Sequence, residues 1–269
     1  MQAAAGSCKS LTNNNIVAAS REGENMLKLY SFGPGANSLK PMLTLFEKFT
    51  FEQDFIVHQL NPRKFEHHAD WFKTLNPRGQ VPALDDQGRI ITESTVICEY
   101  LEDAHPTAVT LRPANHYEVA QMRCWTKWVD EYFCWCVSTI GWHRHVSTMV
   151  KDLPDAEFEE MVARVPVAEQ QVKWRRAREG FPQDMLDEEM RKIAFSVRKL
   201  DDHLADHEWL AGEVYSLADI CNFSVANGMQ FGFAEQVNRE DTPHLVRWIE
   251  QINARPAAAA MFAAVPREF

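Results

Sequence analysis

Apolar and polar residues alternate in short runs near the start of the chain, and further on apolar residues repeat every three or four positions. Residues 26–32, MLKLYSF, alternate with the period of two that predicts a β-strand. A Gly-Pro-Gly break follows, after which residues 37–46 place apolar side chains at helical spacing. The same reasoning predicts a strand at 51–57, a short helix at 65–75, a hairpin about the turn at 85–88 and a helix from 93 onward. This order, β-α-β-α-β-β-α, describes a small α/β domain.

Beyond a linker that begins near residue 103, the period of two disappears and helical spacing takes over. Apolar residues recur at every third or fourth position between 122 and 140, which indicates a long buried helix. Further helices are predicted at 155–178, 186–207, 217–228 and 243–253. The chain is therefore predicted to hold an α/β domain at 26–106 and an all-helical domain at 114–265. Residues 1–25 are either a disordered extension or sequence ahead of a true start at Met26.

The net charge of −10 and the pI near 5.5 exclude one class of partner. Phosphate backbones bind to basic faces, so nucleic acid is not expected as the main ligand. No stretch approaches the roughly 20 apolar residues that span a bilayer, and the first residues do not resemble a secretory signal. The six cysteines lack the spacing of a disulfide framework, which favours reduced thiols in a cytoplasmic protein.

The segment at 76–84, NPRGQVPAL, contains a proline where a predicted helix gives way to a strand. Pro82 cannot donate a hydrogen bond to a sheet, so its position needs another reason. If the Val81–Pro82 bond is cis, the backbone of Val81 turns outward, and its N–H and C=O groups can pair with an extended peptide ligand. Only about 5–6% of such bonds are cis, so the local sequence leaves the isomer open.

The residues Thr92-Glu93-Ser94 open the next predicted helix. The Ser94 hydroxyl and the free N–H groups of the first turn can bind an anion, and the Glu93 carboxylate can pair with an ammonium group beside it. Together they suit an amino-acid head group, which carries a carboxylate and an amine. The alternative interpretation is that Ser94 simply caps the helix.

A third candidate lies in the turn at 33–38, GPGANS, between the first strand and the first helix. Ser38 at the helix start can donate its hydroxyl to a thiolate, and the positive end of the helix dipole favours the same negative charge. Lowering a thiol pKa from about 8.5 by two units needs roughly 2.7 kcal/mol, which one charge-assisted hydrogen bond and a helix end can supply. A plain helix cap is again the alternative.

Together these three features resemble the glutathione transferases. The motif at 76–84, followed by Glu-Ser at a helix start, is typical of their thioredoxin-like domain, and the segment 216–219, SLAD, is similar to the capping box of their helical domain. Asp219 is accordingly assigned to folding rather than to catalysis. The resemblance implies a glutathione transferase fold, in which a thioredoxin-like α/β domain precedes an all-α domain, with glutathione as co-substrate and a homodimer as the assembly.

The resemblance narrows to the bacterial lignin β-aryl etherases, in the branch that acts on the S configuration at the β carbon. It is carried by the segments SFGPGANSLKP, NPRGQVPAL, TESTVICEYLED, WTKWVDEYFCWCVSTIGW, KWRRAR and YSLADICNF, and it covers most of residues 26–262. The likeness implies that glutathione attacks the β carbon of an α-keto β-aryl ether, so that a phenol leaves and a glutathione thioether remains. It also implies a role in lignin degradation and aromatic catabolism.

The family pattern implies a role for each matching residue at the reactive and γ-glutamyl parts of glutathione. Asn37 and Ser38 match the positions that face the sulfur, and they are the predicted catalytic residues. Glu93 and Ser94 match the γ-glutamyl site.

The remaining matches concern the peptide backbone and the glycine end of glutathione. Val81 and Pro82 match the backbone clamp, and His67 and Gln80 match positions that reach the glycine end. His67 departs from the etherase pattern, which has an amide there, although a histidine can also bind a carboxylate.

Aromatic residues of the long helix are candidates for the acceptor pocket. Most are expected in the core, but Tyr132, Trp135 and Trp142 are predicted walls for an aromatic substrate, with His145 beside them. No carboxylate or cysteine completes the histidine pairs at ligand spacing, so no metal is expected. The basic run at 173–178 is expected to form a solvated surface that acidic residues at 184–189 neutralise.

Two other functions stay open. A thiol–disulfide or deglutathionylating transferase usually needs a cysteine at the helix start, where this chain has Asn37-Ser38. A non-enzymatic glutathione-binding protein of the same fold is the other alternative, and the intact sulfur-side and γ-glutamyl motifs speak against it.

Overall fold

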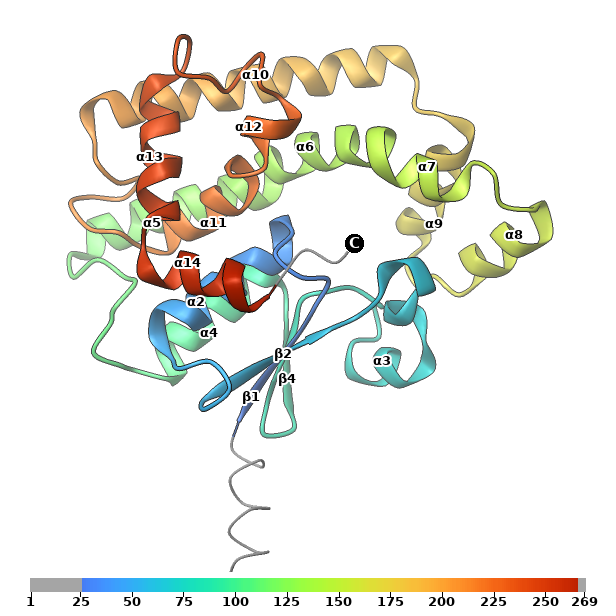
Figure 1. Ribbon diagram of the computed structural model, residues 1–269, viewed down its shortest axis with the longest axis horizontal. Helices are drawn as coiled ribbons and strands as arrows, with labels where there is room; N and C mark the ends of the chain where they lie inside the picture. Colours follow the sequence, from blue (N-terminus) through green and yellow to red (C-terminus); the bar gives the residue numbers. More distant parts are fainter. Residues whose placement is uncertain (1–25, 266–269) are drawn as a thin grey trace, which may run out of the picture.

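The computed structural model describes residues 26–265, in which a small sheet domain packs beneath a larger group of helices (Figure 1). The predicted extension at 1–25 lies outside the described residues. The first domain contains β1 (Leu27–Ser31), α2 (Ala36–Lys48), β2 (Phe55–Gln59), the 3₁₀ turns η1 (Pro62–Lys64) and η2 (Glu66–His68), α3 (Asp70–Leu75), β3 (Ala83–Asp86), β4 (Arg89–Thr92) and α4 (Ser94–Ala104). The predicted order of strands and helices is confirmed.

The four strands form one sheet in the order β2-β1-β3-β4. β1 is parallel to β2 and antiparallel to β3, and β3 and β4 form a hairpin in which Asp86 pairs with Arg89. The two residues between them, Gln87 and Gly88, have positive φ angles of 56° and 84°, as a two-residue hairpin turn of this kind requires.

Alternation along β1 gives the sheet two apolar faces. Leu27 and Leu29 join the main core with α2 and α4, whereas Tyr30 packs against Phe72 of α3. Figure 1 accordingly shows α2 and α4 on one side of the sheet and α3 on the other. This is the thioredoxin-like layering that the resemblance implies.

The second domain is helical throughout. α5 (His116–Trp128), the π-helical turn η3 (Val129–Phe133), α6 (Cys134–Gly141), the π-helical turn η4 (Trp142–Val146) and α7 (Ser147–Val150) follow one another without a break. The helices after them are α8 (Asp155–Ala163), α9 (Ala168–Glu179), α10 (Gln183–Asp206), α11 (Leu217–Ala226), α12 (Met229–Gly232), α13 (Pro243–Asn253) and α14 (Pro256–Ala264). The predicted all-helical second domain is confirmed.

Three predicted elements have clearly different bounds in the structure. The short helix predicted at 65–75 begins only at Asp70, after the 3₁₀ turn η2. The second strand does not begin at residue 51, because residues 52–54 form a turn in which Glu52 has a φ of 63°. The helix predicted at 155–178 is two helices, α8 and α9. Pro166 interrupts it, since a proline disfavours helical geometry at the residue before it, here Val165.

One buried core runs through both domains. It includes Leu39 and Met42 of α2, Phe223 of α11 and Met261 of α14, and α2 packs directly against α11 and α14. The sequence pattern did not predict α14, because its alanine tract carries no amphipathic signal. A proline in the first turn and a run of strong helix formers explain why it is nevertheless helical.

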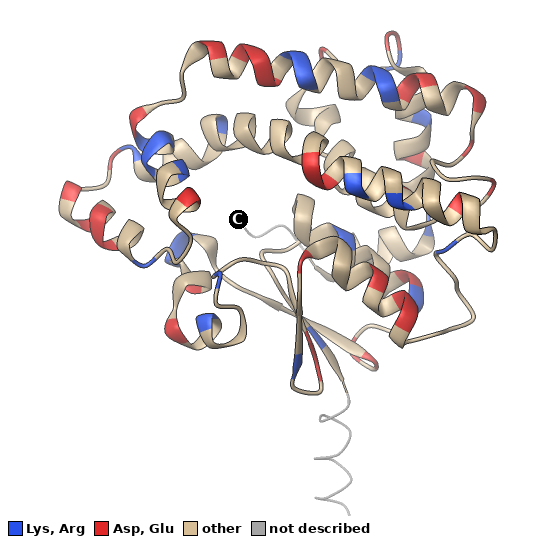
Figure 2. Ribbon diagram, turned by 180° about the vertical axis from the view of Figure 1, so that it is seen from behind, with Lys and Arg blue, Asp and Glu red and all other residues tan. Residues whose placement is uncertain are grey.

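Acidic and basic residues are interspersed along the outer helices, as α10 illustrates in Figure 2. The predicted neutralisation of the basic run on α9 comes from α8 rather than from α10. Arg175 bonds Glu159 at 2.8 Å, and Arg178 bonds Asp155 at 2.6 Å. Within residues 26–265, no helix is both long and apolar enough to span a membrane.

A buried carboxylate, Asp219, fixes the start of α11. Its Oδ2 accepts a hydrogen bond from the Ser216 N–H, and its Oδ1 accepts from the Leu210 N–H and from Nε1 of Trp248, all at 3.0 Å. The Ser216 hydroxyl accepts from the Ala218 N–H at 3.3 Å, so a capping box is present. Burial raises the pKa of Asp219 to about 6, against the opposing effect of these hydrogen bonds. The geometry matches the folding role assigned from the sequence.

Replacing Asp219 by Ala should leave three buried donors without an acceptor, at about 1–3 kcal/mol each. We therefore expect the free energy of unfolding to fall by at least about 3 kcal/mol. Asp202→Ala is the control, because its exposed carboxylate lies 4.0 Å from Arg198 on the surface of α10. Denaturant titrations of both variants measure the difference, and similar stabilities would contradict the assignment. If Asp219→Ala does not fold, Asp219→Asn retains one acceptor and allows the same comparison.

Candidate active site

A cavity of about 390 Å³ lies between the two domains and gathers the sequence motifs. The sheet domain contributes the loop at 76–82 and the start of α4, and the helical domain contributes η3, α6 and α9. A second cavity of about 530 Å³, beside η1 and α8, contains none of these motifs. The lining of the first cavity includes Asn37, His67, His68, Gln80, Val81, Pro82, Glu93, Ser94, Asp130, Cys134, Trp135, Trp142 and Lys173.

The loop at 76–82 is held in shape by its own side chains. The Asn76 amide donates to the Gln80 carbonyl at 2.7 Å, and its Oδ1 accepts from the Arg78 N–H at 3.1 Å. Gly79 has a φ of 60°, and a Cβ there would lie 2.9 Å from the carbonyl oxygen of His67, so only glycine fits. The Val81–Pro82 bond, which the sequence left open, is cis.

The start of α4 opens into the cavity. Ser94 is the first residue of the helix, and no side chain caps it. The Ser94 hydroxyl instead accepts a hydrogen bond from Nζ of Lys40 at 3.4 Å, so its interpretation as a plain cap is wrong. The hydroxyl of Thr95 has no partner among the described residues. The free N–H groups of the first turn and this hydroxyl can receive an anion.

Glu93 precedes α4 in an uncommon conformation for a residue with a side chain, with a φ of 69°. Its carboxylate is 62% exposed and lies 3.9 Å from the guanidinium of Arg78, so this ion pair is weak. A carboxylate on the cavity wall next to an anion site can accept the ammonium group of an amino-acid head group.

An ion pair between a buried lysine and a partly exposed aspartate joins the two domains beside these residues. Nζ of Lys40 on α2 lies 2.5 Å from Oδ1 of Asp130 on η3. Burial opposes the charge on Lys40, but the neighbouring Cys221 and Asp130 outweigh burial and hold the pKa of the ammonium above its usual value. The local sequence does not identify this lysine as a site residue, because it occupies an apolar face of a helix and no acidic residue lies one helical turn away.

The two predicted sulfur-side residues differ in their access to the cavity. Asn37 is exposed, and its Oδ1 accepts hydrogen bonds from the Cys134 thiol at 3.3 Å and from Nζ of Lys40 at 3.5 Å. Ser38 is only 4% exposed and is not part of the cavity lining. Neither residue caps α2, which begins without a side-chain cap. The geometry therefore favours Asn37 over Ser38 for contact with a ligand sulfur.

Two neighbouring histidines with mutually tilted rings lie on the cavity wall beside the loop at 76–82. The ring centroids of His67 and His68 are 3.8 Å apart, and neither Nδ1 has a partner among the described residues. Burial and then the neighbouring His68 lower the pKa of His67 to about 3, while burial and then Lys73 lower that of His68 to about 4. Both rings are neutral near pH 7, so they can donate a hydrogen bond to a carboxylate but cannot form an ion pair with it.

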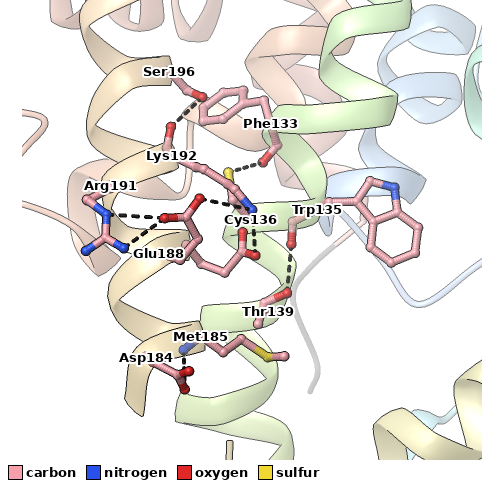
Figure 3. A network of polar contacts seen from close by, with 11 residues as sticks. Phe133, Trp135, Cys136, Thr139, Asp184, Met185, Glu188, Arg191, Lys192 and Ser196 are labelled. Carbon is pink, nitrogen blue, oxygen red and sulfur yellow. Dashed lines mark hydrogen bonds and ion pairs between the residues drawn. The ribbon is translucent and has the colours of Figure 1, made fainter. Parts of the chain in front are cut away.

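The aromatic wall contains two of the four predicted pocket residues. Trp135 and Trp142 line the cavity. Trp135 is 57% exposed and projects from α6 on the side away from α10, opposite the polar network between these helices (Figure 3). Tyr132 and His145 correct the sequence expectation, because neither lies on the cavity wall. Tyr132 stacks on Trp128 and meets Phe195 of α10, and His145 is exposed.

The two π-helical turns explain this difference. Regular α-helical spacing would put residues three apart, such as Tyr132 and Trp135, on one face. The turns η3 and η4 each add a residue to the helical turn, which rotates the following side chains relative to the preceding ones. Regular helical spacing therefore predicts the wrong helix face for residues on opposite sides of η3 or η4.

Lys173 is a cavity residue that the sequence interpretation placed on the surface. Its Nζ lies 3.0 Å from the Ser138 hydroxyl and stands over the rings of Trp142 and Trp135, at 4.7 and 5.6 Å from their centroids. Burial lowers the pKa of Lys173 to about 8, although Cys134 and Glu189 oppose the shift. A basic run on one helix gave no sign that this one lysine turns inward.

The two domains on either side of the cavity match known family models. Residues 25–103 match the glutathione S-transferase N-terminal domain, and residues 133–256 match the glutathione S-transferase C-terminal domain. The chain belongs to the glutathione S-transferase family. It is a transferase, and glutathione is its co-substrate.

Within that family the chain is similar to Protein LigF of Sphingobium sp. (strain NBRC 103272 / SYK-6), with 58% identity over 248 residues, 90% of this chain and 95% of LigF. The crystal structure of the beta-etherase LigF covers 89% of this chain and 99% of its own, with a TM-score of 0.85 and 56% identity. The glutathione transferase GstA of Escherichia coli O157:H7 is 25% identical, over 86% of this chain and 94% of GstA. Glutathione transferase F7 from Populus trichocarpa shares the fold, with a TM-score of 0.69 at 23% identity over 91% and 100% of the two chains.

The Glu93 carboxylate is predicted to bind the γ-glutamyl ammonium of glutathione. Because this carboxylate is largely exposed, we expect Glu93→Ala to weaken glutathione binding by about 1.5 kcal/mol, roughly tenfold. Glu99→Ala is the control, since Glu99 lies on α4, the helix that begins directly after Glu93, and faces Arg123 outside the cavity. Titration calorimetry measures both affinities, and an unchanged affinity in Glu93→Ala would rule out this contact.

Asn37 and Ser38 are predicted to stabilise the glutathione thiolate. Removing a hydrogen bond to the thiolate should raise the thiol pKa of bound glutathione by about one unit, which corresponds to about 1.4 kcal/mol. We expect the larger shift in Asn37→Ala, because Ser38 is buried. Ultraviolet absorbance of the thiolate against pH gives the pKa in both single variants and in the double variant. An unshifted pKa in the double variant would exclude both residues.

Proposed function

We propose that this protein is a glutathione-dependent β-etherase that cleaves α-keto β-aryl ethers of the kind found in lignin. One observation carries the proposal: a single cavity contains both the glutathione motifs of the first domain and the indole rings of Trp135 and Trp142 from the second. Aromatic side chains beside a few polar groups are typical of a pocket for an aromatic ligand. The identity of 58% to LigF supports the same reaction.

The proposed reaction is a displacement at the β carbon. The thiolate of glutathione attacks this carbon, the C–S bond forms, and the C–O bond breaks with its electron pair moving to the phenolic oxygen. A phenol has a pKa of about 10, by analogy with tyrosine, so its anion is a tolerable leaving group next to an activating ketone. The main tasks of the protein are then to align sulfur, carbon and oxygen and to keep the thiol ionised.

The thiol-transferase alternative is less well supported. Cys134 is the cysteine on the cavity wall, and it lies at the start of α6 rather than at the start of α2. Burial raises the pKa of the Cys134 thiol above its usual value, although Lys40 opposes this shift. A thiol of raised pKa is a poor nucleophile near neutral pH. The non-enzymatic alternative does not account for the polar groups on the sulfur side of the cavity.

The proposal also covers the metabolic role, the location and the assembly of the enzyme. The enzyme would act in aromatic catabolism, during the degradation of lignin. A cytoplasmic location supplies reduced glutathione and keeps the cysteines of the chain as thiols. The assembly that accompanies this function is a homodimer, as the family resemblance implies.

The stereochemistry of the products tests the proposal. In-line displacement inverts the attacked carbon, so a pocket shaped for one enantiomer should consume one hand of a racemic ether. We expect the protein with glutathione to release guaiacol from the S enantiomer of β-guaiacyl α-veratrone and to form a thioether of inverted configuration. Chiral chromatography of the digestion measures both. Equal consumption of the two hands would refute the stereochemical assignment, and loss of the R ether alone would assign the protein to the opposite branch of the etherases.

A further inference from the structure

Lys173 is a partly buried cation on the cavity wall without a carboxylate partner. Within residues 26–265 no Asp or Glu forms an ion pair with its Nζ, which donates to the Ser138 hydroxyl at 3.0 Å. The other lysine near the cavity, Lys40, has Asp130 at 2.5 Å. An ammonium removed from water without a counter-ion is costly, so a ligand that carries negative charge in this position would be stabilised strongly.

The surroundings of Lys173 indicate what kind of ligand that is. Its Nζ lies 4.7 Å from the ring centroid of Trp142 and 5.6 Å from that of Trp135. Indole faces attract the ammonium and also provide stacking surfaces for an aromatic group. A negative charge that arises on an aromatic ring held between these side chains would develop next to the ammonium.

We propose that Lys173 is the catalytic residue that stabilises and protonates the departing aryloxide. This inference rests on the proposed etherase function. As the thiolate forms the C–S bond, the C–O bond breaks and its electron pair goes to the phenolic oxygen. A proton of the Lys173 ammonium moves to that oxygen, and the neutral amine regains a proton from water. The balance is one glutathione and one aryl ether consumed, one thioether and one phenol released.

The position of Lys173 suits the leaving group rather than the carboxylates of glutathione. Lys173 contacts Ser138, Trp135 and Trp142, all from the helical domain, whereas the predicted carboxylate sites belong to α4 and to His67 in the sheet domain. Cys134, whose thiol donates to Asn37 on the sulfur side, is also close enough to influence the charge of Lys173. The ammonium is therefore on the aromatic wall, adjacent to the sulfur side.

The protonation of Lys173 matches this role. Burial lowers its pKa to about 8, so the ammonium is mostly charged at pH 7 yet more acidic than a phenol of pKa about 10. Transfer of the proton to the aryloxide is thus favourable. Cys134 on α6 and Glu189 on α10 act on the charge of Lys173, and Asp130, His67 and His68 line the same cavity. The other titratable or charged groups on elements that pack against α9 are His143, Arg144 and His145 on η4 and Asp155, Glu157, Glu159 and Glu160 on α8.

The test compares the wild-type protein with Lys173→Met on two α-keto ethers, one that releases guaiacol and one that releases a nitrophenol. A nitrophenol leaves readily as its anion and needs no proton donor. We expect kcat of Lys173→Met to fall about 10²-fold for the guaiacyl ether and less than about tenfold for the nitrophenyl ether, with glutathione affinity unchanged. Arg175→Met is the control on the same helix, because Arg175 bonds Glu159 at 2.8 Å away from the cavity.

The pH profile gives a second readout. The active form of Lys173 is the protonated one, so kcat of the wild type on the guaiacyl ether should fall as the pH rises through about 8. This fall should be absent in Lys173→Met. Equal losses with both ethers, or a loss of glutathione affinity measured by calorimetry, would overturn the inference. A wild-type protein that binds glutathione but releases neither phenol would refute the proposed function itself, and this inference with it.

Discussion

The ammonium of Lys40 is not exposed to solvent, and side chains from three elements of the structure bind it. Nζ contacts Asp130 at 2.5 Å, Ser94 at 3.4 Å and Asn37 at 3.5 Å, so η3, α4 and the start of α2 meet at one point. Lys40 is fully buried, so removing Asp130 would leave its charge without a counter-ion inside the protein, although the 37% exposure of the Asp130 side chain reduces that cost. The same three elements carry the predicted sulfur site, the γ-glutamyl site and the helical wall of the cavity.

The parts of the fold that the sequence predicted are those with a strong local signal. Alternation in residues 26–32 and the Gln87-Gly88 turn specify the strands and the hairpin, and helical spacing specifies α10 and α13. The predicted elements were wrong or missing where the periodicity of apolar residues was weak or misleading. Pro166 divides a helix that periodicity alone continues, and α14 forms from an alanine tract without an amphipathic face. Its packing on α2 depends on the tertiary structure, which no local window contains.

The same distinction applies to the cavity. Val81 and the first residues of α4 are shaped by residues only a few positions away in the chain, such as Asn76, Gly79 and Pro82 for Val81. A short sequence motif was therefore enough to identify them. Lys40 and Lys173 each depend on partners far along the chain, namely Asp130 and Ser138. Residues beyond a π-helical turn are a third case, because a shift in helical phase changes which face they occupy. Tyr132, a predicted wall of the cavity, lies in the turn η3 and packs against α10 instead.

The distribution of charge around the cavity fits a displacement reaction. Asp130 compensates Lys40, and burial keeps His67 and His68 neutral. The predicted partners of the thiolate, the Asn37 amide and a helix end, are dipoles rather than full charges. A cation in direct contact with the thiolate would lower the thiol pKa further, but nucleophilicity falls with pKa, and attack is fastest when the thiol pKa is close to the ambient pH. In the proposed mechanism, dipoles stabilise the sulfur and the full charge of Lys173 stabilises the aryloxide. The stronger stabilisation then acts where negative charge develops during the reaction, not where it is already present at the start.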